Sequence, residues 1–430
     1  MGGMFETLRN AWKIPDLRRK ILFTVAMLIV YRIGSHIPVP FLNANKFAEL
    51  VEGGALFGMF DIVTGGAFKL ATIFAMSITP YINSSIIMQL LTVAIPKLEQ
   101  LQKEGEEGRK IIAQFTRYGT VILGFLQAVG LFFGLGGAVI GGRTVLTFVT
   151  ITLTFTAGTA FLMWLGEQIT EHGIGNGISL IIFAGIVSRG PSGAMTLVSY
   201  YKAGKFTDNP VIAALAILGI LLVFVAVIVL VIWVNQAERR IPVQYAKRVV
   251  GRKVYGGQST HIPIKVNLAG VIPIIFAMSI VAFPSQMISF FAPNSDNWFI
   301  VWLKNMPSSI WYSVIMAMLI VFFTFFYTII QFNPIEIANN LKKNGGFIPG
   351  IRPGKPTSDY LSKVLNRITW FGGFFLAVIQ IFPSILGAIF KLNNLWFGGT
   401  ALLILVGVAI DTVKQMESQM LMRHYKGFLE

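Results

Sequence analysis

Residues 211–235 read VIAALAILGILLVFVAVIVLVIWVN, and this stretch decides the class of fold. It carries no charged side chain, and a helix that spans a bilayer needs about 20 mostly apolar residues. The rest of the chain has a similar composition, because 54% of its 430 residues are hydrophobic and only 13% are charged. A soluble domain usually has about 25% charged residues. The sequence therefore predicts a polytopic membrane protein and excludes a soluble enzyme.

Ten apolar stretches occur along the chain, and each predicts one membrane-spanning helix. Most of the 35 Lys and Arg residues fall in alternate connections between these stretches. The positive-inside rule places those connections, and both termini, in the cytoplasm. We therefore expect an all-α polytopic membrane protein with ten transmembrane helices. The predicted spans are residues 21–40, 71–95, 114–135, 147–168, 177–195, 211–235, 268–290, 309–332, 368–389 and 398–414.

The ten spans divide into two sets of five. An odd number of spans in each half turns the second half upside down relative to the first, which is the setting for an inverted repeat. The expected segments are an amphipathic cytoplasmic segment at 1–20, halves at 21–195 and 211–414, and a cytoplasmic tail at 415–430. The second half would carry two large cytoplasmic loops, at 236–267 and 334–367.

These two loops contain strongly basic stretches rich in Pro and Gly. They are ERRIPVQYAKRVVGRK at 238–253 and NNLKKNGGFIPGIRPGKP at 339–356. They carry more positive charge than orientation requires, and contact with anionic lipids is the plain explanation. However, Arg352 lies between two Pro-Gly pairs, and such turns hold a side chain at a fixed position. The pattern favours a docking surface for a protein or an RNA backbone.

Two further stretches have a distinctive pattern. Residues 57–69 are too polar and too short to span, and an apolar helix with Pro80 follows them. They predict a half-helix folded back into the protein, with an ordinary outer loop as the alternative. The Gly-rich run at 173–177 lacks the Lys and Ser/Thr of a phosphate-binding loop. We interpret it as a tight turn in which Asn176 or Ser179 caps the next helix, and we expect Ser84 and Ser85 to support helix packing.

No residue pattern predicts catalysis, a metal or a cofactor. The chain has no cysteine, and its four histidines are scattered singly. Acidic residues are almost absent from the spans, whereas ion-coupled transporters usually keep one there. An inverted-repeat secondary transporter therefore remains only as the alternative to a channel.

Five motifs in order resemble the SecY family, which forms the channel of the bacterial Sec protein translocon. They are TPYINSSIIMQLLT (79–92), EQITEHGIGNGISLIIFAGIV (167–187), ERRIPVQYAKR (238–248), HIPIKVNLAGVIPIIF (261–276) and NNLKKNGGFIPGIRPG (339–354). The resemblance implies two pseudo-symmetric five-helix halves around an hourglass pore, with a short plug half-helix, in the bacterial plasma membrane. The implied function is to pass unfolded secretory polypeptides and to release apolar segments sideways into lipid through a lateral gate.

The resemblance also implies roles for particular residues. The pore ring would consist of isoleucines: Ile78, Ile82, Ile178, Ile182, Ile275 and Ile404. The plug would include Phe57, Gly58, Met59, Phe60, Asp61, Ile62, Val63, Thr64, Gly65 and Gly66. The lateral gate would involve Asn83 and Gln89. The docking cations would be Arg239, Arg240, Lys247, Arg248, Arg252, Lys253, Lys342, Lys343 and Arg352.

The family also implies partners. These are the small membrane subunits SecE and SecG, the motor ATPase SecA, the ribosome, secretory preproteins with signal sequences, and anionic lipids. The implied role is not enzymatic, because the motor or the ribosome would drive transport.

Overall fold

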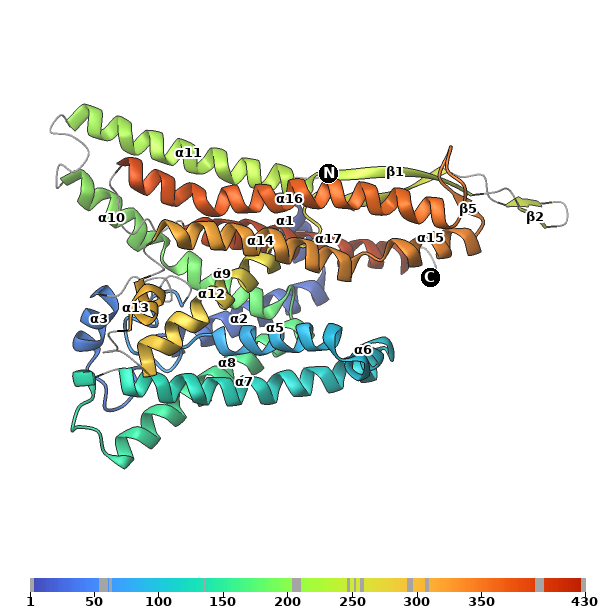
Figure 1. The fold of residues 1–430 in the computed structure, drawn as a ribbon. Helices are drawn as coiled ribbons and strands as arrows, with labels where there is room; N and C mark the ends of the chain where they lie inside the picture. The colour runs from blue at the N-terminus through green and yellow to red at the C-terminus, as the bar shows by residue number, and fades with distance from the viewer. Residues whose placement is uncertain are drawn as a thin grey trace.

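The computed structural model describes residues 4–53, 61, 64–134, 136–202, 210–245, 248–250, 253–255, 259–291, 297–305, 309–390 and 398–426. Within these ranges the chain is a bundle of long helices that run roughly along one direction, with short strands at one end (Figure 1). Among the described residues, seven helical stretches are long and apolar enough to cross a membrane. The architecture is that of a polytopic helical membrane protein.

In the residues that the structure describes, the first half contains helices, turns and isolated bridges. The helices are α1 (Met4–Lys13), α2 (Pro15–Gly34), α3 (Ala44–Gly53), α5 (Thr79–Ala94), α6 (Pro96–Lys103), α7 (Glu106–Gly134), the short 3₁₀ turn η1 (Gly136–Ala138), α8 (Val145–His172), α9 (Gly177–Ser188) and α10 (Gly190–Lys202).

The second half combines helices with short strands. They are α11 (Pro210–Gln236), β1 (Glu238–Tyr245), β2 (Arg248–Val250), β3 (Lys253–Tyr255), β4 (Ser259–Lys265), α12 (Ile272–Phe291), α13 (Trp298–Asn305), α14 (Ile310–Gln331), α15 (Pro334–Lys343), β5 (Gly346–Phe347), α16 (Lys355–Phe390) and α17 (Gly399–Lys426).

Several predicted spans differ from the helices observed. The span expected at 177–195 is divided between α9, which ends at Ser188, and α10, which begins at Gly190. The helix expected at 21–40 is α2, which ends at Gly34, and Pro38 and Pro40 follow it. The helix expected at 71–95 is the 16-residue α5. Its predicted start was wrong, because Ala71 and Ser77 have φ of 51° and 52°, which a right-handed helix does not allow. The helix expected at 268–290 is α12, which begins only at Ile272.

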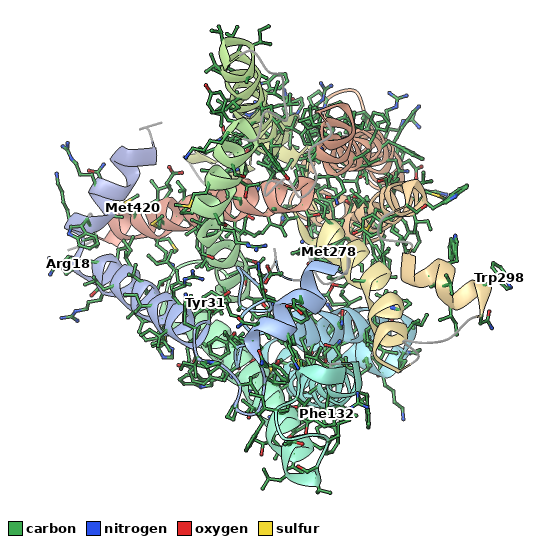
Figure 2. All side chains as sticks on the ribbon, turned by 90° about the vertical axis from the view of Figure 1, so that its left-hand side faces the viewer. Arg18, Tyr31, Phe132, Met278, Trp298 and Met420 are labelled. Carbon is green, nitrogen blue, oxygen red and sulfur yellow. The ribbon has the colours of Figure 1, made fainter. Side chains whose placement is uncertain are left out.

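The two halves occupy different parts of the bundle. Figure 2 looks at the bundle from the end that carries α3 and α10. The helices α2, α5, α7 and α8 gather in its lower part, with Tyr31 and Phe132, while α14, α16 and α17 lie above them. Met278 of α12 lies at the boundary. A large apolar cluster crosses this boundary, because it includes Ile82 from the first half and Ile274 from the second.

A small β-sheet lies at one end of the bundle, in the two basic loops, where the sequence predicts no regular structure. The strand order is β4-β1-β5, and β1 pairs antiparallel with both neighbours. Figure 1 places this sheet at the same end as α6, α15 and the C-terminus. The segments that the sequence assigns to one side of the membrane therefore lie together.

Candidate functional site

The six candidate pore isoleucines all belong to the large apolar cluster that joins the two halves. Ile78, Ile82, Ile182 and Ile404 are buried in it, and Ile178 and Ile275 pack against it half-buried. They come from the start of α5 and from α9, α12 and α17. Residues nearly 330 positions apart in the sequence thus belong to one apolar cluster.

Ile178 also has a local packing role. A Cβ atom built on Gly166 of α8 would lie 2.4 Å from its Cδ1 atom. The side chain therefore fills the space that the glycine leaves between α8 and α9. This contact accounts for part of the burial of Ile178 without any reference to a pore.

Helix α5 packs closely against α7. The Ser84 hydroxyl donates a hydrogen bond to the Thr116 carbonyl at 2.8 Å, and Gly119 leaves the space in which the Ser84 side chain lies. The prediction that Ser84 supports helix packing is confirmed.

The candidate gate seam is closed by direct helix contact. Helix α12 packs against both α5 and α7, and α12 packs on α14 on its other side. Asn83 of α5 is buried and Gln89 is half-buried. These two candidate polar residues of the gate are therefore largely withdrawn from the surface of the chain.

Sequence reasoning missed Gln127 on α7. This side chain is 1% exposed, and neither its Nε2 nor its Oε1 atom has a hydrogen-bond partner among the described residues. The buried hydroxyl of Thr159 on α8 also has no hydrogen-bond partner among the described residues. A lone glutamine within the apolar run 121–133 was the signal that could have identified it.

The segment before α5 is folded into the protein. We use the term plug segment for its described part, Asp61 and residues 64–69. Thr64, Ala67 and Phe68 are buried, so the alternative of an ordinary outer loop does not fit. Asp61 is helical, and residues 64–69 form turns, in which Gly65 and Gly66 have φ of 67° and 91°, so the half-helix predicted at 57–69 does not extend over 64–69. Residues 57–60, 62 and 63 lie outside the described ranges.

The Gly-rich run at 173–177 is a structural turn. The Asn176 Oδ1 atom accepts a hydrogen bond from the Ser179 N–H at 3.1 Å and caps α9. The Thr170 hydroxyl accepts another from the Gly177 N–H at 2.9 Å. The predicted cap by Asn176 is confirmed. The described part of the chain contains no group of three or more His, Cys, Asp or Glu residues that could hold a metal.

The two basic loops form one unit, which we call the cytoplasmic sheet after the side of the membrane that the sequence predicts for it: β1, β4, β5 and the segments packed on them. Strand β1 pairs with β4 along seven residues, from Glu238↔Lys265 to Gln244↔Ser259. It pairs with β5 of the other loop through Gln244↔Phe347 and Tyr245↔Gly346. Pro242 has no N–H group to donate to a neighbouring strand. The pairing of β1 with β5 is confined to Gln244 and Tyr245, so Pro242 lies outside it.

The cytoplasmic sheet has its own apolar core. Ile241 and Val243 of β1 and Ile264 of β4 are buried against Leu341 of α15 and Leu361 of α16. The residues of β1 alternate between buried and exposed from Arg240 onward, as expected for a strand with one face on a core. The candidate docking cations therefore belong to one packed unit and not to two separate loops.

The described docking cations are exposed on this unit. They are Arg239, Arg240, Lys342, Lys343 and Arg352. Arg240 is paired with Glu238 at 2.7 Å, so part of its charge is already compensated. Lys247 and Arg252 lie outside the described ranges. Arg248 and Lys253 belong to the hairpin of β2 and β3.

Arg352 is held in a constrained turn. Gly350 and Gly354, on either side of it, have φ of 81° and 98°. The Arg352 carbonyl accepts a hydrogen bond from the Thr357 hydroxyl at 2.9 Å. Its neighbour Ile351 packs against the core of the cytoplasmic sheet. The backbone of Arg352 is thus held by the turn, as predicted, and its side chain is exposed.

Comparisons with known proteins agree with this geometry. The family model described as SecY matches residues 72–413. The protein translocase subunit SecY of Halalkalibacterium halodurans is 48% identical over 99% of this chain and 100% of its own length. Those of Bacillus subtilis and Thermotoga maritima are each 46% identical, again over 99% of this chain, and over 100% and 98% of their own lengths.

Solved structures show the same fold. A structure described as that of a protein-conducting channel has a TM-score of 0.64 at 20% identity and covers 93% of this chain and 92% of its own. A SecY structure concerned with how its plug domain stabilises the closed state has a TM-score of 0.61 at 19% identity, with the same coverage. The predicted fold class is confirmed, and a secondary transporter is not favoured. On the end-to-end identity with these translocase subunits, the chain belongs to the SecY family.

Proposed function

We propose that this channel subunit passes unfolded secretory polypeptides through a constriction lined by Ile78, Ile82, Ile178, Ile182, Ile275 and Ile404. The observation that carries the proposal is that these isoleucines, from both halves, belong to the one apolar cluster that joins the halves. Branched apolar side chains make no hydrogen bonds, so they fit around any sequence. A narrow apolar constriction also excludes ions when it closes, because water leaves it.

The lateral exit for apolar segments lies between α5 and α7 on one side and α12 and α14 on the other. The contact of α12 with α5 and α7 is the seam that would part. Asn83 and Gln89 would exchange contacts with water or with the entering segment. The driving force is the transfer of apolar surface into lipid, at about 25 cal/mol per Å².

The cytoplasmic sheet is the proposed seat of the motor SecA or the ribosome. Its exposed cations, Arg239, Lys342, Lys343 and Arg352 among them, stand on a packed core. A related fold is Sec61 in the canine ribosome-channel complex, which supports a ribosome as a partner. SecE and SecG would complete the complex, and anionic lipids would contact the remaining cations.

This assignment places the protein in the bacterial plasma membrane with both termini in the cytoplasm. The charge distribution supports that orientation, because the basic loops and the C-terminus lie at one end of the bundle (Figure 1). The chain itself would carry out no chemical step. The bound motor or ribosome supplies the energy, and secretory preproteins with signal sequences are the cargo.

The test is a crosslink between a stalled secretory chain and the proposed constriction. The protein has no cysteine, so any disulfide crosslink to the channel must come from the substituted position. Ile182→Cys should form a disulfide with a cysteine placed in the translocating segment of the stalled chain. Leu222→Cys, on the exposed face of α11, is the matched control. Equal adducts at both positions, or adducts only at Leu222→Cys, would contradict the proposed path.

A further inference from the structure

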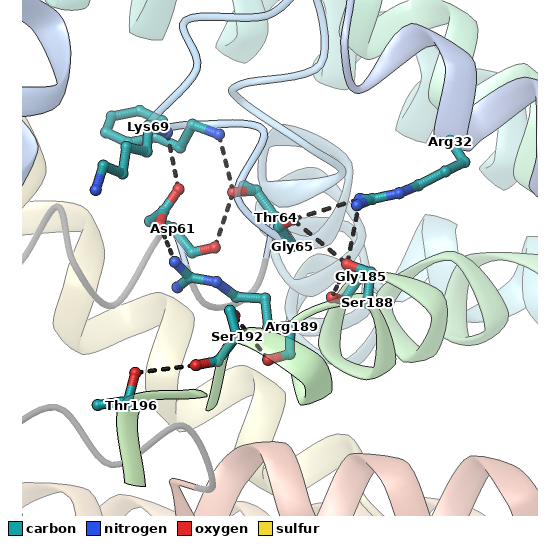
Figure 3. A network of polar contacts seen from close by, with 11 residues as sticks. Arg32, Asp61, Thr64, Gly65, Lys69, Gly185, Ser188, Arg189, Ser192 and Thr196 are labelled. Atoms are coloured by element: carbon teal, nitrogen blue, oxygen red, sulfur yellow. Dashed lines mark hydrogen bonds and ion pairs between the residues drawn. The ribbon is translucent and has the colours of Figure 1, made fainter. Parts of the chain in front are cut away.

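The plug segment is joined to the end of α9 by an ion pair. The Asp61 Oδ2 atom lies 2.6 Å from the Arg189 Nη2 atom, and the two side chains are 4% and 24% exposed. Arg189 is the residue at which α9 ends and after which α10 begins. Figure 3 shows the pair in the polar network around the plug segment. The charge of Asp61 is thus compensated by a residue 128 positions later in the chain.

A second set of contacts lies beside this pair. The Arg32 side chain of α2 donates to the Ser188 hydroxyl at 3.2 Å and to the Gly65 carbonyl at 3.5 Å. The Ser188 hydroxyl bonds to the Gly185 carbonyl at 2.7 Å. The Tyr31 hydroxyl donates to the Thr64 carbonyl at 3.4 Å. Helices α2 and α9 therefore both hold the plug segment, mostly through its backbone.

Asp61 also shapes the plug segment itself. Its Oδ1 atom accepts a hydrogen bond from the Lys69 N–H at 2.8 Å. Its carbonyl accepts from the Gly66 N–H at 3.0 Å and from the Thr64 hydroxyl at 3.2 Å. One carboxylate oxygen thus closes the turn and the other reaches Arg189. The same residue fixes the shape of the segment and its attachment.

The energetics of such a pair suit an attachment that must release. Removal of one partner leaves a buried, uncompensated charge, which is strongly destabilising. Release of the intact pair into water returns hydration to both charges, so the net cost of separation stays small. An apolar contact of the same area has no such compensation, because its exposure to water is unfavourable throughout. The ion pair therefore fixes the position of the plug segment and still allows the segment to separate reversibly.

We propose that Asp61 and Arg189 form a latch that holds the plug segment against the α9–α10 junction and sets how readily the channel opens. This proposal rests on the proposed function, in which this segment closes the pore. Arg189 acts here as a positioning residue, since it acts on the pore only through Asp61. The latch joins the plug segment to the last span of the first half, directly before α11.

The test measures the resting ion conductance of the purified channel complex in planar lipid bilayers. Arg189→Met removes the charge and keeps a similar stem, and Asp61→Asn keeps an acceptor for the Lys69 N–H. Each should raise the resting conductance by about tenfold or more, because Arg189→Met leaves the buried charge of Asp61 unpaired and Asp61→Asn leaves the half-buried charge of Arg189 unpaired. Arg189→Lys keeps the charge and should stay close to the parent protein. Arg143→Met is the matched control, because Arg143 bonds to the Phe133 carbonyl instead.

Two results would overturn the latch. The first is a conductance of Arg189→Met and Asp61→Asn equal to that of Arg143→Met. The second is a rise in Arg189→Lys as large as in Arg189→Met, since the charge would then be irrelevant. Deletion of residues 57–66 separates this failure from that of the proposed function. If the deletion raises conductance and the substitutions do not, the latch alone is wrong; if the deletion has no effect, the segment is not a plug.

Discussion

The cytoplasmic sheet and the plug segment both carry functional charges on loops, but different interactions hold them in place. The cytoplasmic sheet rests on an apolar core that includes Val243 and Leu361, and its cations point outward. The plug segment is fixed by the buried pair of Asp61 and Arg189 and by bonds to backbone carbonyls. The cations of the cytoplasmic sheet are exposed to a partner, whereas the charge of Asp61 in the plug segment is paired within the protein.

The difference indicates which part moves. An apolar core loses its stabilisation when it is exposed to water, so the cytoplasmic sheet is suited to stay assembled while a partner binds and leaves. A polar attachment exchanges its bonds with water at small net cost. The plug segment is therefore suited to leave and to return. Three substitutions test this contrast.

The largest expected effect comes from Val243→Asp. Val243 is fully buried in the core of the cytoplasmic sheet, and an unpaired carboxylate there should destabilise the unit by about 3 kcal/mol or more. Motor-driven export and ribosome binding should both fail. Gln244→Asp, on the exposed face of the same strand, should bind normally. Limited proteolysis of loops 236–267 and 334–367 measures the unfolding, and equal protection of the two variants would contradict the proposed core.

Arg352→Glu should act on docking alone. The arginine is exposed and its backbone is fixed by Thr357, so the charge reversal leaves the cytoplasmic sheet folded. We expect a loss of about tenfold or more in motor-driven export, because a reversed charge meets a partner selected for a cation. Lys363→Glu, an exposed residue of α16, makes the same charge change away from the turn. Export assays on inverted vesicles measure both variants, and an equal loss would show that only net charge matters.

A smaller effect is expected from Gly65→Ala in the plug segment. Both Gly65 and Gly66 have positive φ, and alanine there costs about 1–2 kcal/mol. A Cβ atom on Gly65 would also lie 2.6 Å from the Gly185 carbonyl oxygen, whereas one on Gly66 meets nothing within 4 Å. Gly65→Ala should therefore raise the resting conductance more than Gly66→Ala. A larger rise in Gly66→Ala would show that backbone strain, and not contact with α9, controls the segment.

The long helices could be predicted from the sequence because their signal is local and repeated. The span expected at 211–235 is α11, which covers Pro210–Gln236, and that at 309–332 is α14, Ile310–Gln331. The start of α5 could not be predicted, because the positive φ of Ala71 and Ser77 depends on their packing and not on their composition. Helix α16 begins at Lys355, 13 residues before the predicted span at 368, because it continues beyond the apolar stretch.

The candidate site was predictable in its residue types and not in its connections. The basic loops and Asn176 carry local signals of charge and capping. The pairing of Gln244 with Phe347 joins residues about 100 positions apart, and no local pattern indicates it. Pro242 and neighbouring arginines also hide the alternation of β1. The pair of Asp61 and Arg189 was missed for the same reason, because each residue alone resembles an ordinary loop charge.

The pairing of β1 with β5 has a consequence for the order in which the protein is made. Strand β1 leaves the ribosome first, but its partner Phe347 and the core residues Leu361 and Leu365 follow more than 100 residues later. The proposed seat for a partner is therefore complete only after β5 and the start of α16 have been synthesised. An incomplete chain thus presents no finished platform, and under the proposed function a motor would be recruited only by a channel whose second half is nearly finished.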